Sequence, residues 1–295
     1  MSVAPSRVTK KRPEDLVVEN ERLFALPEAY IRLQEKMQDP NVSINELARL
    51  VSQDTDITAR LLRLVNGPVF GFQGRVDTVT RAIALIGMRE LELLLLATVA
   101  VESFKDIDVD VASMATFWQH SVFCAVSAQT LAKRAGVLNP ERLFVAGLLH
   151  DIGALVMWKE MSVVAADLLT HAAMGSQRLH ELERARLGYD HGEVGAMLMK
   201  LWNLPISLQM MAAHHHTPQL AEHHLLDASI MHVADLLAEA RDLPHYEAVE
   251  QICDPVAWRL LKLSQDSLKT ITGEAIMQFM DAVEMLLPEV YRSHR

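Results

Sequence analysis

A six-residue segment in the middle of the sequence places a common metal ligand beside an acidic residue. Residues 148–153 read Leu-Leu-His-Asp-Ile-Gly, so His150 stands next to Asp151 in an apolar stretch. Neighbouring helical residues project about 100° apart, so the two side chains share a metal ion only where a helix end or another helix adds ligands. Burying both without partners is costly, and Gly153 removes side-chain bulk beside them. We predict a metal site or the remnant of one, with an ordinary hydrogen-bonded pair as the alternative.

The elements that would hold this segment are expected to be helices. Ser43 and Glu46 form an S-x-x-E capping box, and Asn66, Gly67 and Pro68 follow a helical stretch in the order that ends helices. The sequence has no alternating strand pattern of useful length. A helix opened by residue 140 is expected to carry residues 148–153, and another begins at 88. Further helices are expected at residues 44–53, 57–65, 78–86, 111–135, 162–174, 176–187, 191–202, 206–216, 225–240, 255–263 and 273–287.

The composition supports an all-α fold and narrows the kind of partner. Half of the 295 residues are apolar but only 5% are aromatic, and 15 are Met. This suits a core of packed helices better than a β-sandwich. The formal net charge is −10 and the pI is near 5.7, so the chain offers no basic field for a phosphate backbone. We therefore expect no nucleic-acid partner.

The cysteine content and the hydropathy point to the cytoplasm. Cys124 and Cys253 permit one disulfide at most, and we expect them to be reduced, buried thiols. The first 20 residues lack the apolar run of a secretory signal. The densest apolar run, residues 93–101, is about half the length needed to cross a bilayer. We expect this run to be a core helix and expect no membrane association.

Several spaced segments resemble a known family. Residues 148–153 resemble the signature of HD-domain metal-dependent phosphohydrolases. Other segments resemble, in order, the pattern of one branch of that superfamily, the HDOD or HD-related output domain; these are residues 26–27, 50–54, 59–66, 82–87, 117–121 and 202–205. The resemblance covers about residues 22–240. It implies a multi-helical HD-domain-like bundle with an additional N-terminal helical lobe.

The resemblance also suggests a division of the chain. Residues 1–21 are expected to be a polar N-terminal tail, and residues 22–240 the HDOD domain. Within that domain an N-terminal helical lobe spans about residues 22–105 and an HD-like lobe about residues 106–240. Residues 241–295 are expected to be a C-terminal helical extension packed on the HD-like lobe.

HD-domain phosphohydrolases hold one or two metal ions with a His, the HD doublet, further His residues and a final Asp on separate helices. Matched residue by residue, the resemblance implies these ligands: His120, His150, Asp151, His191, His215, His216 and Asp235. Mixed imidazole and carboxylate donors suit Fe, Mn, Zn or Ni better than Mg or Ca. The implied cofactor is one or two divalent transition-metal ions.

Each implied ligand also has an ordinary structural interpretation. His120 on an apolar helix also fits a hydrogen-bonded core histidine. The run 214–216 falls at an expected helix end, where exposed histidines are common, and the sequence does not decide which of the three are ligands. Asp235 also fits a solvent-facing position, and Asp190 next to His191 also fits an N-cap.

Two departures from the active HD pattern bear on function. Active HD hydrolases often have a Lys after H-D-I-G, suited to a phosphate, whereas this chain has Ala154. The cyclic-dinucleotide branch continues after its paired His with an acidic, Gly-Tyr-Pro-containing segment, whereas residues 217–220 here are Thr-Pro-Gln-Leu. HDOD domains are regarded as degenerate relatives that relay signals. The resemblance therefore implies a non-enzymatic bacterial signal-transduction output domain that binds signalling proteins supplied in trans or a small effector.

The sequence leaves the stimulus, the partner, the metal and the oligomeric state open, and it allows two other functions. One is a metal-dependent phosphohydrolase acting on a nucleotide or another phosphoester, with Asp151 as a catalytic residue. The other is a metal or redox sensor that uses the same ligands without hydrolysis.

Overall fold

The predicted all-α class is confirmed. A computed structural model describes residues 11–67, 70, 72, 74–104, 107, 112–175, 177–241 and 247–287, and every regular element in these ranges is a helix. The first helices are α1 (Pro13–Glu19), α2 (Glu28–Met37), α3 (Ile44–Val51), α4 (Thr55–Val65), α5 (Val79–Ile86) and α6 (Met88–Phe104). The next are α7 (Met114–Arg134), α8 (Glu141–Leu149), α9 (Ile152–Glu160), α10 (Ser162–Met174), α11 (Leu179–Leu187), α12 (His191–Leu201) and α13 (Ile206–His214). The last are η1 (Pro218–Leu220), η2 (Glu222–His224), α14 (Leu225–Glu239), α15 (Glu247–Ile252), α16 (Pro255–Leu260) and α17 (Gln265–Leu286).

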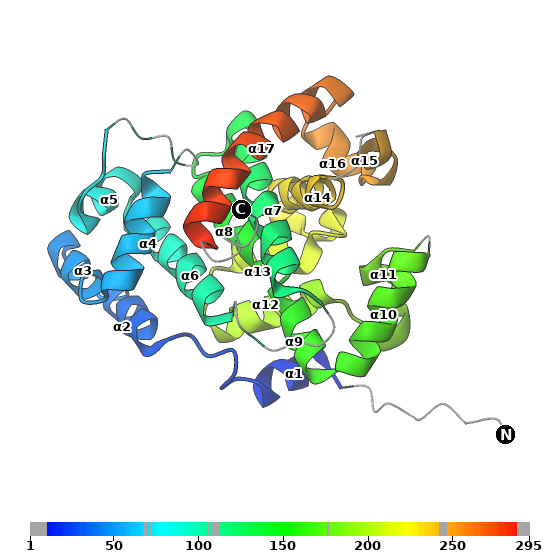
Figure 1. Cartoon of the computed structure of the whole chain (residues 1–295), viewed down its shortest axis with the longest axis horizontal. Helices are drawn as coiled ribbons and strands as arrows, with labels where there is room; N and C mark the ends of the chain where they lie inside the picture. The colour runs from blue at the N-terminus through cyan, green and yellow to red at the C-terminus, as the bar shows by residue number, and fades with distance from the viewer. Residues whose placement is uncertain are drawn as a thin grey trace.

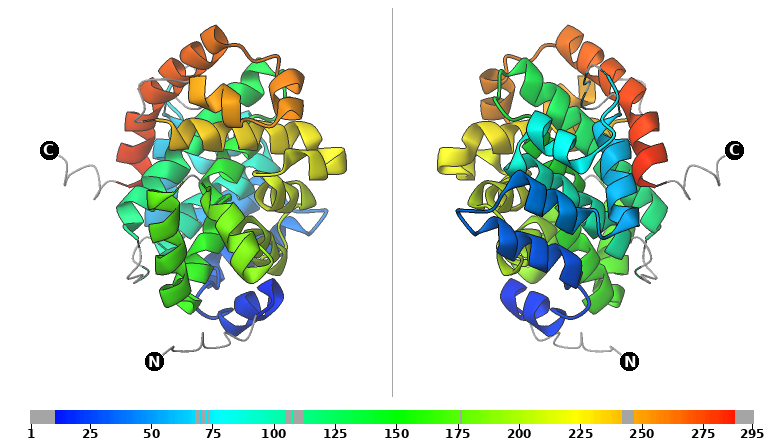
Figure 2. Two further views of the ribbon diagram at one scale, coloured as in Figure 1. Left: turned by 90° about the vertical axis from the view of Figure 1, so that its right-hand side faces the viewer. Right: turned by 90° about the vertical axis from the view of Figure 1, so that its left-hand side faces the viewer.

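The helices form two outer groups around a central set. In Figure 1, α3, α4 and α5 gather on one side of the molecule and α10 and α11 on the other, with α7, α8, α12, α13 and α14 between them. Figure 2 shows α1 at one end of the molecule and α15 and α16 at the opposite end. None of the helices in the described ranges is both long enough and apolar enough to span a membrane.

The centre is built around α7. Every residue from 121 to 132 is buried, and α7 packs against α8, α14 and α17. The helix begins where the Ser113 hydroxyl accepts a hydrogen bond from the backbone N–H of Thr116 at 3.4 Å. Its last turn carries Lys133 and Arg134, whose charge is favourable at a helix C-terminus. Packing on three sides fixes this helix, and with it the backbone of His120.

Trp202 joins the N-terminal helices to the central set. Its indole N–H donates to the backbone oxygen of Phe24 at 2.8 Å. The ring of Trp202 stacks on that of Phe104 with centroids 5.7 Å apart and planes at 8°. The backbone oxygen of Trp202 accepts from the Gln34 amide at 3.2 Å. Because Trp202 follows directly on α12, these contacts tie α12 to α2 and α6.

The expectation that one helix carries residues 148–153 is wrong. α8 ends at Leu149 and α9 begins at Ile152, with His150 and Asp151 at the junction. The break redirects the chain so that α9 packs closely on α12. A Cβ at Gly153 would lie 2.1 Å from the backbone oxygen of His191, so only glycine fits at this crossing. The chain changes direction at His150 and Asp151, so these two adjacent side chains can contribute to the same site.

Two helix positions differ from the expectations, and the state of the two cysteines agrees with them. Residues 13–19, which lie in the stretch expected to be a polar tail, form α1, whose Leu16 and Val17 are buried against α9 and α12. α17 begins at Gln265 instead of 273, because the Ser264 hydroxyl caps it, accepting from a backbone N–H at 3.2 Å. Cys124 and Cys253 are both buried and free, as expected.

Candidate metal centre

The seven expected ligands converge in the central set of helices. They come from α7 (His120), the α8–α9 junction (His150, Asp151), the start of α12 (His191), the residues that follow α13 (His215, His216) and α14 (Asp235). Their ligand-type atoms form two groups, and within each group all atoms lie within 4.8 Å of one another. Residues more than 100 positions apart in the chain thus meet at one place, since His120 and Asp235 are separated by 115 residues.

The first group contains His120, His150, Asp151 and Asp235. The Nε2 atom of His120 lies 3.1 Å from Oδ1 of Asp235 and 3.5 Å from Oδ2 of Asp151. The Nε2 atom of His150 lies 3.2 Å from Oδ2 of Asp151 and 3.5 Å from Oδ1 of Asp235. Two imidazole nitrogens therefore face two carboxylate oxygens. Asp235 is only 2% exposed, so the solvent-facing alternative is excluded.

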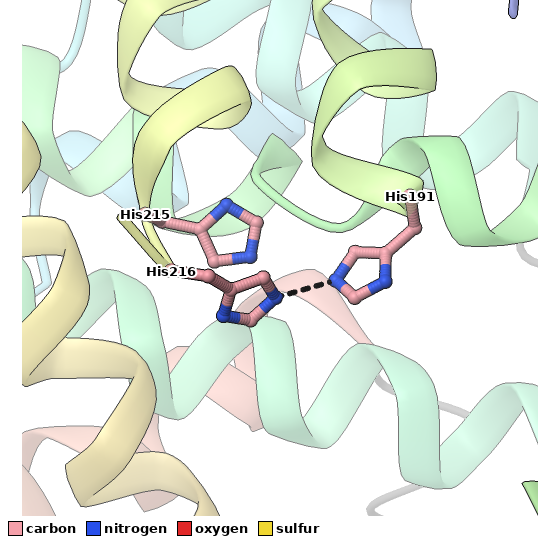
Figure 3. Close-up of side chains that lie close together, drawn as sticks. All are labelled: His191, His215 and His216. Carbon is pink, nitrogen blue, oxygen red and sulfur yellow. Dashed lines mark hydrogen bonds between the residues drawn. The ribbon is translucent and has the colours of Figure 1, made fainter. Parts of the chain in front are cut away.

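The second group contains His191, His215 and His216, whose rings face one another in Figure 3. The Nε2 atoms of His216 and His191 are 2.9 Å apart. The ring centroids of His215 and His216 are 3.8 Å apart. His214, the last residue of α13, belongs to neither group. The geometry thus distinguishes His215 and His216 from His214, a choice that the sequence left open.

Asp151 lies between the two groups. Its Oδ2 atom faces the first group, at the distances given above, while its Oδ1 atom lies 3.3 Å from Nε2 of His191 and 3.5 Å from Nε2 of His215. A carboxylate with one oxygen toward each group has the placement of a ligand shared by two ions. The side chain of Asp151 is 18% exposed and that of His120 is 23% exposed, so the cluster is open on their side.

The hydrogen bonding of the cluster fits a metal. The Nδ1–H groups of His150 and His215 donate to the backbone oxygens of Gly147 and Ala212, at 2.8 and 2.7 Å. This fixes a proton on Nδ1 and points Nε2 inward, as is usual for metal-ligating histidines. Several buried cluster atoms have no hydrogen-bond partner within the described part of the chain: His150 Nε2, His215 Nε2, His216 Nδ1, Asp151 Oδ1 and Asp235 Oδ2. Leaving such atoms unpaired is costly, and a bound cation would satisfy them.

The carboxylates and two of the histidines are in the protonation states that metal binding requires. Burial would raise the pKa of Asp151, but His150 and His191 outweigh it and hold that pKa well below its usual value. The hydrogen bond from His120 and the nearby imidazole of His150 likewise overcome burial and keep the pKa of Asp235 low. Burial, reinforced by His150, lowers the pKa of His215 to about 3. Burial and His215 lower the pKa of His216 as well.

The pKa values of His150 and His191 shift in the opposite direction to those of His215 and His216. Burial would lower the pKa of His191, but the negative charge of Glu183 raises it well above 6.5. Burial would also lower the pKa of His150, but Asp151 raises it well above 6.5. Both imidazoles are therefore doubly protonated and positively charged near neutral pH when no metal is bound.

Metal binding is expected to release protons and to weaken as the pH falls. His150 and His191 must each lose the Nε2 proton to bind a metal. The pKa values of both histidines lie above 6.5 in the metal-free fold. Below those pKa values protons compete with the metal for Nε2, and this competition ends as the pH rises through them. Up to two protons should leave per chain at neutral pH. Calorimetric titration with metal in buffers of different ionisation enthalpy counts them, and metal binding without proton release would contradict the assignment.

Three side chains that the sequence interpretation missed contact the cluster. Glu183 of α11 is 2% exposed, and its Oε2 atom accepts from Nδ1 of His191 at 2.6 Å and from the backbone N–H of His191 at 3.0 Å. His180 stacks on His216 with centroids 3.9 Å apart and planes at 14°. Arg178 lies beside Asp235. The sequence did contain one signal: Glu183 lies four residues from Leu187, on the buried face of α11.

The turn between α11 and α12 sets the direction of His191. Gly188 ends α11 with φ 92° and ψ 1°, a left-handed conformation that favours glycine. Asp190 then caps α12, as Oδ1 accepts from the backbone N–H of Glu193 at 3.1 Å. The N-cap interpretation of Asp190 is thus confirmed. Arg184 holds the same carboxylate through a 2.8 Å ion pair.

Glu183→Gln is expected to weaken metal binding while the fold is kept. The amide retains the shape of the carboxylate but removes the charge that makes His191 basic and fixes its ring. Such partners of metal ligands typically account for about 10- to 100-fold in metal affinity. Competition with a chromophoric chelator measures the change. Glu284→Gln, an exposed substitution on α17, is the matched control, and equal affinities of the two variants would contradict a role for Glu183.

The arrangement of helices and histidines agrees with a family profile. The profile of the HDOD domain matches residues 23–218, well over half of the chain. The chain belongs to the HDOD domain family. The family named from the sequence motifs is therefore confirmed.

Known proteins resemble this HDOD chain over most of its length. A structure from Shewanella amazonensis SB2B, described as a candidate phosphohydrolase, is 27% identical with a TM-score of 0.71 and covers 92% of this chain and 97% of its own. An HDOD domain protein of unknown function from Geobacter sulfurreducens has the same fold, with 23% identity, a TM-score of 0.72 and coverage of 93% and 98%. An uncharacterised protein of Treponema pallidum is 28% identical over 200 residues. That match covers 67% of this chain and 38% of the relative, so this chain spans well under half of the relative's length.

Proposed function

We propose that this HDOD domain is a metal-binding signal-transduction output domain that acts by binding a partner or an effector rather than by turning over a substrate. The observation that carries the proposal is the position of Asp151 between two groups of histidine and aspartate side chains. Within the described part of the chain, buried ligand-type atoms without a hydrogen-bond partner come from three separate segments, and leaving them unpaired is costly unless something binds them. In this proposal the domain acts in the cytoplasm, its signalling partners are supplied in trans, and nucleic acid and membrane are not among them.

Two ions are accommodated by the donor set. His120, His150 and Asp235 would hold one, His191, His215 and His216 would hold the other, and Asp151 would serve both. Mixed nitrogen and oxygen donors favour Fe, Mn, Zn or Ni. Such ions supply charge that orients an anionic group and lowers the pKa of bound water. The chain's own residues orient the imidazoles through Gly147, Ala212 and Glu183.

Packing around position 154 supports binding without turnover. Ala154, which stands where active HD hydrolases often have a phosphate-binding Lys, is 4% exposed in α9. The preceding Gly153 is in backbone contact with α12. The phosphate-binding side chain of active relatives is therefore missing, while the residues expected as metal ligands are present.

A metal-dependent phosphohydrolase is the second candidate. It is favoured by the complete ligand set and by the partial exposure of His120 and Asp151, which leaves one side of the cluster accessible. The Shewanella amazonensis protein described as a candidate phosphohydrolase, at 27% identity, also favours it. In this case Asp151 would be a catalytic residue, because it lies where both ions would meet.

Elemental analysis paired with a phosphoester screen tests the proposal. Gently purified protein should contain Fe, Mn, Zn or Ni at up to two ions per chain, and it should not hydrolyse nucleotides or p-nitrophenyl phosphoesters faster than Asp151→Asn does. Hydrolysis that is lost in Asp151→Asn would favour the second candidate. Protein that neither retains metal nor takes it up would overturn both.

The domain division remains part of this proposal. Trp202 contacts Phe24 and Phe104 of the N-terminal lobe, which links residues 22–105 mechanically to α12 of the HD-like lobe. α17 packs on α7 and α4, so the C-terminal extension covers both lobes. We propose that a change at the metal centre reaches the N-terminal lobe through α12.

A further inference from the structure

Arg178 lies beside the metal centre, on the short segment between α10 and α11. Its side chain is 22% exposed. One terminal nitrogen of its guanidinium lies 2.9 Å from Oε2 of Glu239 and 3.6 Å from Oδ2 of Asp235. Glu239 is the last residue of α14, one turn beyond Asp235, so the ion pair fixes the guanidinium against the helix that supplies a ligand.

Within the described residues, most of the hydrogen-bonding capacity of Arg178 is unused. The guanidinium has five N–H donors, and in the described part of the chain its hydrogen bond is to Glu239. The 3.6 Å separation from Asp235 is too long for a hydrogen bond. An arginine guanidinium stays protonated in proteins. Among the described residues, Arg178 is thus a permanent cation with free donors.

Arg178 places a positive charge beside the carboxylates of the centre. The carboxylates in contact with the histidines or with the guanidinium are Asp151, Asp235, Glu183 and Glu239. Bound divalent ions would offset the negative charge of these carboxylates. The guanidinium of Arg178 would then favour an anion at the same place.

The guanidinium adjoins the cluster through Asp235. Oδ1 of Asp235 lies 3.1 Å from His120 and Oδ2 lies 3.6 Å from Arg178, and the side chains of His120 and Arg178 are both partly exposed. A planar guanidinium with free parallel N–H groups matches the oxygen pairs of phosphate.

We infer that Arg178 recognises a phosphate group of the effector beside the metal centre. The inference rests on the proposed metal centre. The ions and Arg178 contact the same phosphate, and Glu239 keeps the guanidinium in place. The effector is accordingly a phosphate-bearing molecule.

Binding of inorganic phosphate to the metal-loaded full chain tests this role. Arg178→Gln should bind phosphate about tenfold more weakly or worse, the loss expected when a charged hydrogen bond is removed. Arg178→Lys keeps the charge without the planar fork, and its affinity should lie between those of the wild type and Arg178→Gln. Arg186→Gln, an exposed substitution on α11, the helix that follows Arg178, makes the same change in net charge and should bind as the wild type does. Isothermal titration calorimetry gives the affinities.

The metal content of each sample distinguishes failure of the proposed metal centre from failure of the phosphate-binding role of Arg178. A wild-type protein that takes up no metal would overturn the metal centre and this inference with it. A fully loaded Arg178→Gln protein that binds phosphate like the wild type would overturn the inference alone. Acetate provides the ligand comparison, and acetate binding as tight as that of phosphate would overturn the phosphate assignment in favour of a carboxylate.

Discussion

Gly153→Ala is expected to destabilise the fold by about 3 kcal/mol and to abolish metal binding. The added Cβ would lie 2.1 Å from the backbone oxygen of His191 and 2.3 Å from the backbone nitrogen of Gly195. Both contacts are with backbone, so no side-chain rotation relieves them. α9 and α12 would have to move apart, and this separates Asp151, just before α9, from His191, the first residue of α12. Urea unfolding of the metal-free protein measures the first effect, and metal titration the second.

Gly273→Ala is the matched control. Gly273 lies inside α17, and a Cβ there would meet nothing within 4 Å. Alanine is favoured over glycine in a helix, so this variant should gain about 0.5–1 kcal/mol in the free energy of unfolding. Metal affinity should stay unchanged. If Gly153→Ala matched the wild type in stability and metal content, the close packing of α9 on α12 would not be needed for the centre.

The doublet illustrates how much of this could be predicted from sequence. His150 and Asp151 were identifiable because a charged pair in an apolar run needs partners, and capping signals and composition were sufficient for the all-α class. The break at the doublet was missed, since residues 141–160 contain no proline and the glycine that precedes the doublet, Gly147, lies inside α8. The direction change depends on how α9 meets α12, and that contact joins segments about 40 residues apart.

The ligand set shows where local patterns stop being informative. Periodicity alone left Asp235 and His120 as either ligands or ordinary residues, and the resemblance was needed to group them. Burial then excluded the solvent-facing alternative for Asp235, which is 2% exposed and whose Oδ1 lies 3.1 Å from Nε2 of His120. Glu183 and Arg178 were missed, since their partners are on other helices. Contacts between helices, rather than residue types, determine which polar side chains surround the centre.

Asp151→Asn should remove at least one of the two ions and weaken the binding of the other by about 100-fold or more, because even indirect partners of ligands account for 10- to 100-fold. Asp151 is the side chain with oxygens within 3.5 Å of histidines from both groups. The amide keeps the size of the side chain but has a single acceptor oxygen and no charge. One group therefore loses its carboxylate, and the mutual repulsion of two ions is no longer reduced. Elemental analysis and chelator competition give the stoichiometry and the affinities.

The same substitution separates a shared ligand from a merely structural aspartate. Asp151 keeps the pKa of His150 high, so in the metal-free variant His150 should lose its proton at lower pH, which nuclear magnetic resonance of the imidazole can follow. Asp167→Asn, on the exposed face of α10, should leave both the metal content and that titration unchanged. A variant that lost neither ion would place Asp151 outside the coordination of both metals. A variant that lost one ion and kept full affinity for the other would assign Asp151 to a single group. Asp151 would then not be a ligand shared by the two ions.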